Sequence, residues 1–97
     1  MTYKKRIVLS CPNGYKPKLD SLVENFIRDG VSFIGVIGKD CEKVEDIIDE
    51  LIVGDGSDDS RFILTSSHPG GSVDEAIEFA KGLDLENADG SVQTVEL

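Results

Sequence analysis

The sequence predicts a small three-layer α/β/α sandwich built on a mainly parallel, four-stranded sheet. Short apolar runs alternate with longer segments of helical periodicity, in the order βαβαβαβ. The apolar runs contain few polar residues, which is typical of parallel strands buried on both faces. Residues that commonly begin or end helices flank the helical segments. With 97 residues, the chain makes one domain, residues 1–97.

The first predicted strand and helix lie within residues 3–29. Tyr3–Cys11 is predicted as a strand, because its apolar run is short, contains β-branched residues and ends at a Pro-Asn-Gly turn. Pro17–Asp29 is predicted as a helix with Pro17 at its first position, where a missing N–H costs nothing. Its apolar residues recur at helical spacing and form one stripe: Leu19, Leu22, Val23, Phe26 and Ile27.

The second strand and helix follow within residues 31–53. Val31–Gly38 is apolar on both faces, as expected of a central parallel strand. Asp40–Val53 is predicted as a helix whose first N–H groups are capped by the Asp40 carboxylate. The outer face of this helix is acidic. It is either a solvated surface or a docking face for a basic partner. The residues of that face are Glu42, Glu45, Asp46, Asp49 and Glu50.

The remaining elements are a third strand, a third helix and an edge strand. A polar loop at Gly54–Ser60 leads to the strand Arg61–Thr65. Ser72–Gly82 is predicted as a helix opened by a Ser-x-x-Glu capping box. After an acidic turn at residues 84–90, Ser91–Glu96 mixes polar and apolar residues as an edge strand does, and its direction is left open. Two strand orders fit: 2-1-3-4, flavodoxin-like, and 3-2-1-4, Rossmann-like.

Charge and composition narrow the function classes. A net charge of −9 disfavours nucleic acid as a partner, although the chain starts with basic residues. We interpret Lys4, Lys5 and Arg6 as solubilising the start of the first strand. No apolar run is long enough for a membrane span or a signal peptide, so we expect a cytoplasmic protein. There Cys11 and Cys41 stay free thiols. One histidine and no C-x-x-C predict neither metal nor cofactor.

The three predicted strand-to-helix junctions mark the expected binding site. In a parallel sheet they share the carboxyl edge, where ligands of such folds bind. Free N–H groups at helix starts favour a small anionic ligand, and a protein partner is the other possibility. The glycine pair matches no phosphate-loop pattern, and turn chemistry accounts for it. The candidate ligand-binding residues are Asn13, Lys39, Ser66, Ser67, His68, Gly70 and Gly71.

An alternative function is a small enzyme, or a phosphoryl or thiol carrier. It would use Cys11 as nucleophile and His68 as base, with Ser66 and Ser67 nearby. A thiol at a strand end facing a helix N-terminus has a lowered pKa. The run Cys11-Pro12-Asn13-Gly14 resembles the C-x-x-G of phosphocysteine IIB subunits of bacterial sugar phosphotransferase systems. Tyr15-Lys16-Pro17 replaces their small hydroxyl-rich residues, so a buried, structural Cys11 is the preferred interpretation.

The main functional prediction is therefore a non-catalytic binding or interaction module with its site at the carboxyl edge of the sheet. Its partner would be a protein or a small anion. A domain of this size has little room for a deep pocket unless it pairs with itself or with another chain, so a homo-oligomer is also considered. The expected interaction surfaces are the edge strand Ser91–Glu96 and the acidic second helix.

Overall fold

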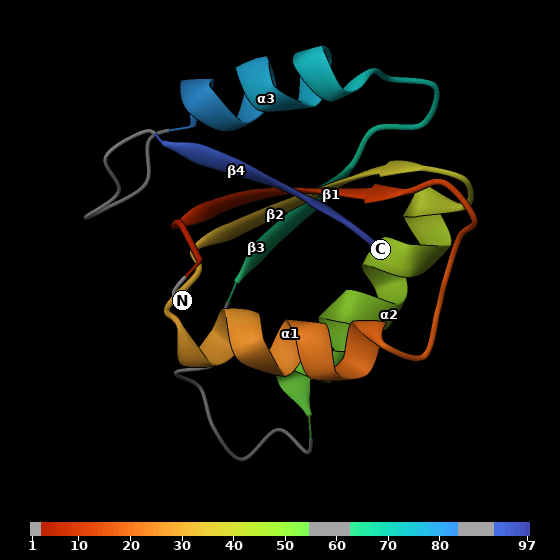
Figure 1. The fold of residues 1–97 in the computed structure, drawn as a ribbon, viewed down its shortest axis with the longest axis vertical. Coiled ribbons are helices and arrows are strands. Elements are labelled where there is room, and N and C mark those ends of the chain that lie inside the picture. Colours follow the sequence, from red (N-terminus) through yellow and green to blue (C-terminus); the bar gives the residue numbers. More distant parts are fainter. Residues whose placement is uncertain (1–2, 55–62, 84–90) are drawn as a thin grey trace.

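The computed structural model describes residues 3–54, 63–83 and 91–97 and has the predicted three-layer architecture. The sheet contains β1 (Arg6–Cys11), β2 (Phe33–Gly38), β3 (Leu64–Ser67) and β4 (Val92–Glu96), all parallel. On one face lie α1 (Leu19–Arg28) and α2 (Cys41–Val53), and on the other lies α3 (Val73–Gly82) (Figure 1). The predicted fold class is confirmed.

The strand order is β3-β2-β1-β4. Of the two orders that the sequence leaves open, the sheet therefore has 3-2-1-4. Ser91–Glu96 forms an edge strand as predicted, and it runs parallel to β1. The chain passes outward from β1 to β3, and then α3 returns it to the far side of β1. Because crossovers of this kind are right-handed, the change of direction puts α3 on the face opposite to α1 and α2.

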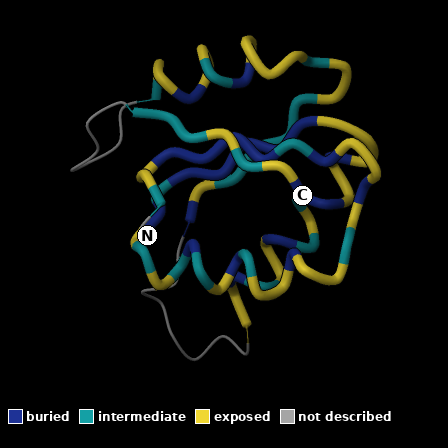
Figure 2. The backbone as a smooth tube through the Cα atoms, in the orientation of Figure 1, coloured by how far each residue is buried: buried dark blue, intermediate teal, exposed yellow. Residues whose placement is uncertain are grey.

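Two apolar cores lie on the two faces of the sheet. Successive residues of the central strands point alternately to either side, so β1 and β2 are buried along most of their length (Figure 2). The larger core lies against α1 and α2 and includes Ile7, Leu9, Cys11, Ile34, Val36 and Cys41. The smaller core lies under α3 and consists of Val8, Phe33, Ile37, Ala76 and Ala80. The small alanines let α3 approach the sheet closely.

The position of β3 differs from its prediction. The sequence predicts Arg61–Thr65, whereas the strand spans Leu64–Ser67, and Arg61 and Phe62 lie outside the described residues. Backbone bonds extend past the apolar run, since Leu64 N–H donates to Ser32 O and His68 N–H to Val36 O, both at 3.0 Å. Polar side chains are tolerated because β3 is an edge strand, only partly buried.

Two predicted helix starts need correction, and a third is confirmed. Helix α1 begins at Leu19, because Pro17 instead lies in a preceding turn in which Leu19 N–H donates to Lys16 O at 2.9 Å. Asp40 is the N-cap residue of α2, but its carboxylate makes no capping bond, and its backbone is left-handed with φ of 55°. At α3, Glu75 N–H donates to Ser72 Oγ at 3.2 Å, as one half of the predicted capping box requires.

Other predictions concern the chain start, the loops and the membrane. Lys4 and Lys5 are exposed, whereas Arg6 is buried, so the interpretation of Arg6 as a solvated residue is wrong. Beyond Gly54, the predicted loop Gly54–Ser60 lies outside the described residues, as does the predicted acidic turn at residues 84–90. Within the described ranges, no helix has the length and apolar character needed to cross a bilayer.

Candidate functional site

The first two strand-to-helix junctions are tied together at the carboxyl edge. The Cys11 carbonyl accepts hydrogen bonds from Gly14 N–H at 3.2 Å and from Lys39 N–H at 2.9 Å. Gly38 has φ of 105°, and a Cβ atom there would lie 2.5 Å from Cys11 O. Only glycine fits so close to another backbone. This contact fixes where α2 begins relative to β1.

The third junction is a tight turn that leads into α3. Gly71 N–H donates to His68 O at 3.0 Å, Pro69 is the second residue of the turn, and Gly70 is the third with φ of 74°. Proline followed by a glycine of positive φ is typical of a type II turn. The two glycines predicted as ligand-binding therefore have a structural reason to be there. Gly70 in addition borders the hollow described next.

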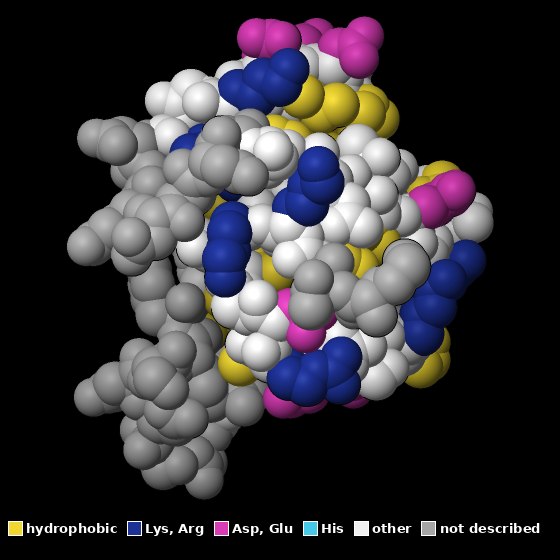
Figure 3. All heavy atoms as spheres, turned by 60° about the vertical axis from the view of Figure 1, so that its left-hand side comes forward, with side chains coloured by type: hydrophobic (Ala, Val, Ile, Leu, Met, Phe, Trp, Pro, Cys, Tyr) yellow, Lys and Arg dark blue, Asp and Glu magenta, His cyan; other side chains and the backbone are white. Residues whose placement is uncertain are grey.

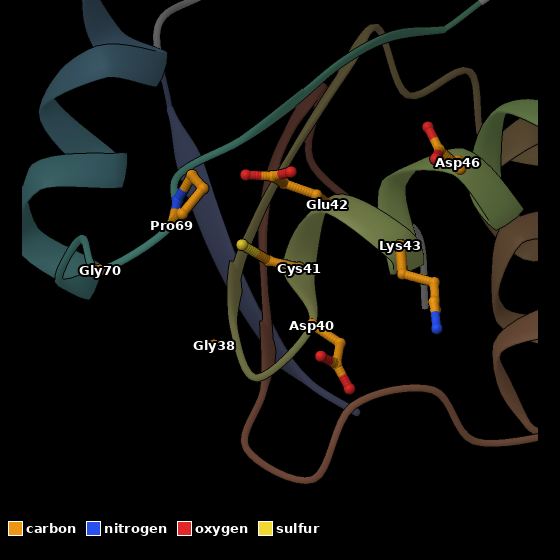
Figure 4. A pocket seen from close by; sticks show the side chains of 8 residues that line it. All are labelled: Gly38, Asp40, Cys41, Glu42, Lys43, Asp46, Pro69 and Gly70. Atoms are coloured by element: carbon orange, nitrogen blue, oxygen red, sulfur yellow. The ribbon is translucent and has the colours of Figure 1, made fainter.

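An open hollow of about 510 Å³ lies between the start of α2 and this turn (Figure 4). In Figure 4, Cys41 and Glu42 point toward Pro69, whereas Asp40 and Lys43 point toward the loop after β1. Of the predicted ligand-binding residues, only Gly70 is among its lining residues. Glu42 and Asp46 belong to the acidic face of the second helix that the sequence offered as a docking face, whereas Pro69 was not predicted. The lining residues are Gly38, Asp40, Cys41, Glu42, Lys43, Asp46, Pro69 and Gly70.

Ser66 and His68 form a pair on the α3 face of the sheet. Ser66 Oγ and His68 Nε2 are 2.9 Å apart, and the imidazole meets the Phe79 ring edge-on with centroids 4.8 Å apart. His68 Nε2 also lies 3.6 Å from the position that a Cβ atom of Gly35 would occupy. The imidazole is thus held between β2 and α3, so packing accounts for its position. Asn13 and Lys39 are exposed at the first two junctions.

The two thiols are buried in the core under α1 and α2. Burial, with a smaller contribution from nearby Cys41, raises the pKa of Cys11 from its ordinary value of 9.0 to about 11. This direction is opposite to the one expected for a thiol facing a helix N-terminus. Cys11 also lies on the face of the sheet opposite to Gly35 and His68. The structure therefore does not bring Cys11 and His68 together as nucleophile and base.

Comparison with known proteins gives a family and no function. Residues 4–94 match the family described as "Domain of unknown function (DUF7684)". The chain belongs to this family. No curated protein and no solved structure matches it. Within the described ranges, no three His, Cys, Asp or Glu side chains are grouped so that they could hold a metal ion. The surface of this DUF7684 domain therefore carries the evidence for its function.

A second open hollow, of about 410 Å³, lies beside β3, and we call it the β3 groove. Thr65 Oγ1 lies 3.0 Å from Glu45 Oε2 and 2.6 Å from Asp49 Oδ1, so two carboxylates meet one hydroxyl there. The hydroxyl has one proton and can donate to one carboxylate at a time. The aliphatic side chains of Ile52, Val53 and Ile63 form much of the rest of the groove. Its lining residues are Glu45, Asp49, Ile52, Val53, Ile63, Leu64 and Thr65.

One row of acidic residues on α2 joins the two hollows. Glu42, Glu45, Asp46 and Asp49 have the spacing i, i+3, i+4 and i+7, which places them on one side of a helix. We call these four residues the acidic stripe. Two of them line the hollow at the carboxyl edge and the other two line the β3 groove.

Proposed function

We propose that this domain is a non-catalytic interaction module that binds a positively charged segment of a protein partner along the acidic stripe. The observation that carries this proposal is that the stripe borders two open hollows at once. A surface of this kind offers a partner both shape and charge. Carboxylates at the margin of an interface speed association with a basic partner and favour it over an acidic one.

The charges around the first hollow support a basic partner over a small anion. Its lining includes three carboxylates, from Asp40, Glu42 and Asp46, and one ammonium group, from Lys43. An anion would meet net repulsion there in spite of the helix N-terminus. The face shown in Figure 3 differs, because lysine and arginine side chains are spread over it, with acidic ones most numerous at its upper rim. A basic partner is therefore favoured at α2 and not over the whole surface.

The placement of the chemically reactive groups supports binding without catalysis. Cys11 has a raised pKa and is separated from His68 by the sheet. His68 is held by Ser66 and Phe79, and neither Ser66 nor His68 lines the hollow at the carboxyl edge. The alternative of a thiol carrier thus gains no support from the geometry. The reactivity of Cys11, discussed below, tests that alternative directly.

The test is an NMR titration with an oligolysine peptide. The unmodified domain should bind this peptide, with the largest amide shifts in α2 and at His68 and Gly70. Binding should weaken as salt rises toward about 0.5 M. The double variant Glu42→Lys with Asp46→Lys should bind about tenfold more weakly, because two attractive charges become repulsive.

The matched control is Asp74→Lys with Glu78→Lys. These residues have the same spacing and the same position relative to the start of α3, on the opposite face of the sheet. The control should bind the peptide as the unmodified domain does. If both double variants bind the peptide equally weakly, the effect comes from the net charge of the domain alone, which contradicts the proposal. If inorganic phosphate shifts the amide resonances around the hollow more than the peptide does, the hollow is an anion site instead.

A further inference from the structure

The outer edge of β3 presents backbone groups that β2 does not use. Leu64 N–H and His68 N–H donate to β2, at Ser32 O and Val36 O. Because the groups of a strand point alternately to its two sides, the N–H and C=O of Thr65 and Ser67 point away from β2. β3 is the last strand in the sheet order, so no strand among the described residues pairs with this edge.

The side of this edge that faces α2 is the β3 groove. Its acidic part consists of Glu45 and Asp49, which belong to the acidic stripe. Its apolar part includes Ile52 and Val53, and Val53 is 59% exposed. A side chain lying beside β3 on this face would meet carboxylates at one position and aliphatic groups at the next. A long basic side chain suits both, since its stem is apolar and its end is charged.

The side of the edge that faces α3 combines two exposed apolar side chains with the Ser66–His68 pair, and it is only partly covered. α3 packs mainly over β1 and β2. Leu64 is left 38% exposed and Phe79 45% exposed, large fractions for apolar residues next to a core. Side chains beside β3 on this face would cover both. The two faces of the edge therefore favour different side chains in a bound segment.

We propose that the β3 edge binds an extended segment of the partner as a fifth strand, with basic and apolar residues in alternation. The backbone of the segment pairs with Thr65 and Ser67, as in other cases of strand addition to a sheet edge. Its basic residues face the acidic stripe, and its apolar residues cover Leu64 and Phe79. This inference rests on the proposed function and specifies the kind of partner.

Charge argues against a second copy of this chain and against the β4 edge as the place of pairing. Two copies joined through β3 would bring their Glu45 and Asp49 side chains toward each other, where like charges repel. At the other edge, the exposed residues Thr94 and Glu96 are polar, and Lys18 lines the hollow beside β4. Glu96 lines the same hollow, so the opposite charges of Lys18 and Glu96 offset each other and leave no net attraction for a basic segment there.

The experiment measures the affinity of a short peptide of alternating lysine and valine for proline variants at the two edges. Ser67→Pro removes an N–H that points away from β2, and prolines at such edge positions leave the sheet intact. We expect it to weaken binding about tenfold, while Ser67→Ala, which keeps the N–H, binds normally. Thr94→Pro is the matched control, since its N–H points away from β1, and it should also bind normally. Amide NMR spectra confirm that each variant is folded.

Peptide variants test the same pairing from the other partner. N-methylation of alternate residues blocks one edge of the peptide, so only one of the two methylation patterns should abolish binding. Binding unaffected by Ser67→Pro and by both methylation patterns would overturn the fifth strand. The proposed function would still stand in that case, provided that Glu45→Lys with Asp49→Lys weakens binding about tenfold.

Two further outcomes distinguish failure of the proposed function from failure of the fifth-strand inference. If the peptide does not bind even at low salt, the proposed function fails, and the inference fails with it. A dimer in sedimentation experiments whose Thr65 and Ser67 amides are protected from exchange would overturn the inference by identifying a second copy as the strand partner.

Discussion

Arg6 lies at the start of β1 beneath the carboxyl end of α3. Its guanidinium donates to the carbonyls of Ala80 and Leu83, the latter at 2.7 Å, and only 4% of the residue is exposed. Its Nε has no partner among the described residues. The last carbonyls of a helix lack partners within the helix and carry partial negative charge. The Arg6 guanidinium therefore provides hydrogen bonds to two carbonyls at the end of α3 and connects that helix to β1.

Replacing Arg6 by methionine should destabilise the domain by about 2–4 kcal/mol, because two carbonyls at the end of α3 lose a charged donor. Urea unfolding measures this change. The control is Arg28→Met, since Arg28 is exposed and pairs only loosely with Asp29 at 3.5 Å. That change should cost no more than about 0.5 kcal/mol. Equal effects from the two substitutions would contradict the role given to Arg6.

Cys11 gives the domain a dependence on alkaline pH. Its pKa is raised by burial from 9.0 to about 11, so above pH 9 the unfolded chain loses this proton first. The stabilising contribution is complete below pH 9 and is lost as the pH rises to about 11, amounting to roughly 2–3 kcal/mol. The free energy of unfolding, measured from pH 9 to pH 11, should fall less steeply with pH in the Cys11→Ala variant than in the unmodified domain.

The same pKa bears on the thiol-carrier alternative. Cys11 should react slowly with iodoacetamide near neutral pH, because almost none of it is thiolate and the side chain is buried. Fast alkylation of the folded domain at neutral pH would contradict this and would reopen the alternative.

Among the elements, the connection between β2 and α2 passes very close to the backbone of β1. Gly38→Ala would place a methyl group 2.5 Å from Cys11 O in a left-handed backbone, so we expect a loss of about 3 kcal/mol or more. Gly70 also has positive φ, but a Cβ atom there meets nothing within 4 Å, so Gly70→Ala should cost only about 1 kcal/mol. Thermal unfolding compares the two, and similar losses would show that backbone strain alone matters at Gly38.

The sequence predicted the elements better than their ends. Apolar periodicity placed all three helices and the two central strands, because those segments bury one stripe or both faces. Apolar periodicity placed β3 too early in the sequence, because an edge strand needs no apolar pattern to form backbone hydrogen bonds. The side-chain cap predicted for Asp40 fails because the tight Gly38 turn puts that residue in a left-handed conformation. No local pattern shows such a turn.

At the scale of the whole molecule, the fold class followed from the sequence, whereas the strand order and the candidate site followed only in part. Both strand orders allow the same alternation of elements, so pairing between distant strands decides the order, and local pattern does not record it. The carboxyl edge was correctly expected to bring the junctions together. The acidic face of the second helix was predicted as one possible docking face, but its position beside the third junction depends on tertiary packing, which local pattern does not record.

The place of β4 next to β1 has a consequence for synthesis on the ribosome. Of the four described strands, β1 is made first, but its neighbour β4 is made last. Until residues 92–96 have left the ribosome, β1 is itself an edge strand, and apolar residues that β4 later helps to cover are open to other nascent chains. Exposed Lys4 and Lys5 lie just before β1, and their charges would disfavour pairing of two unfinished chains at that edge.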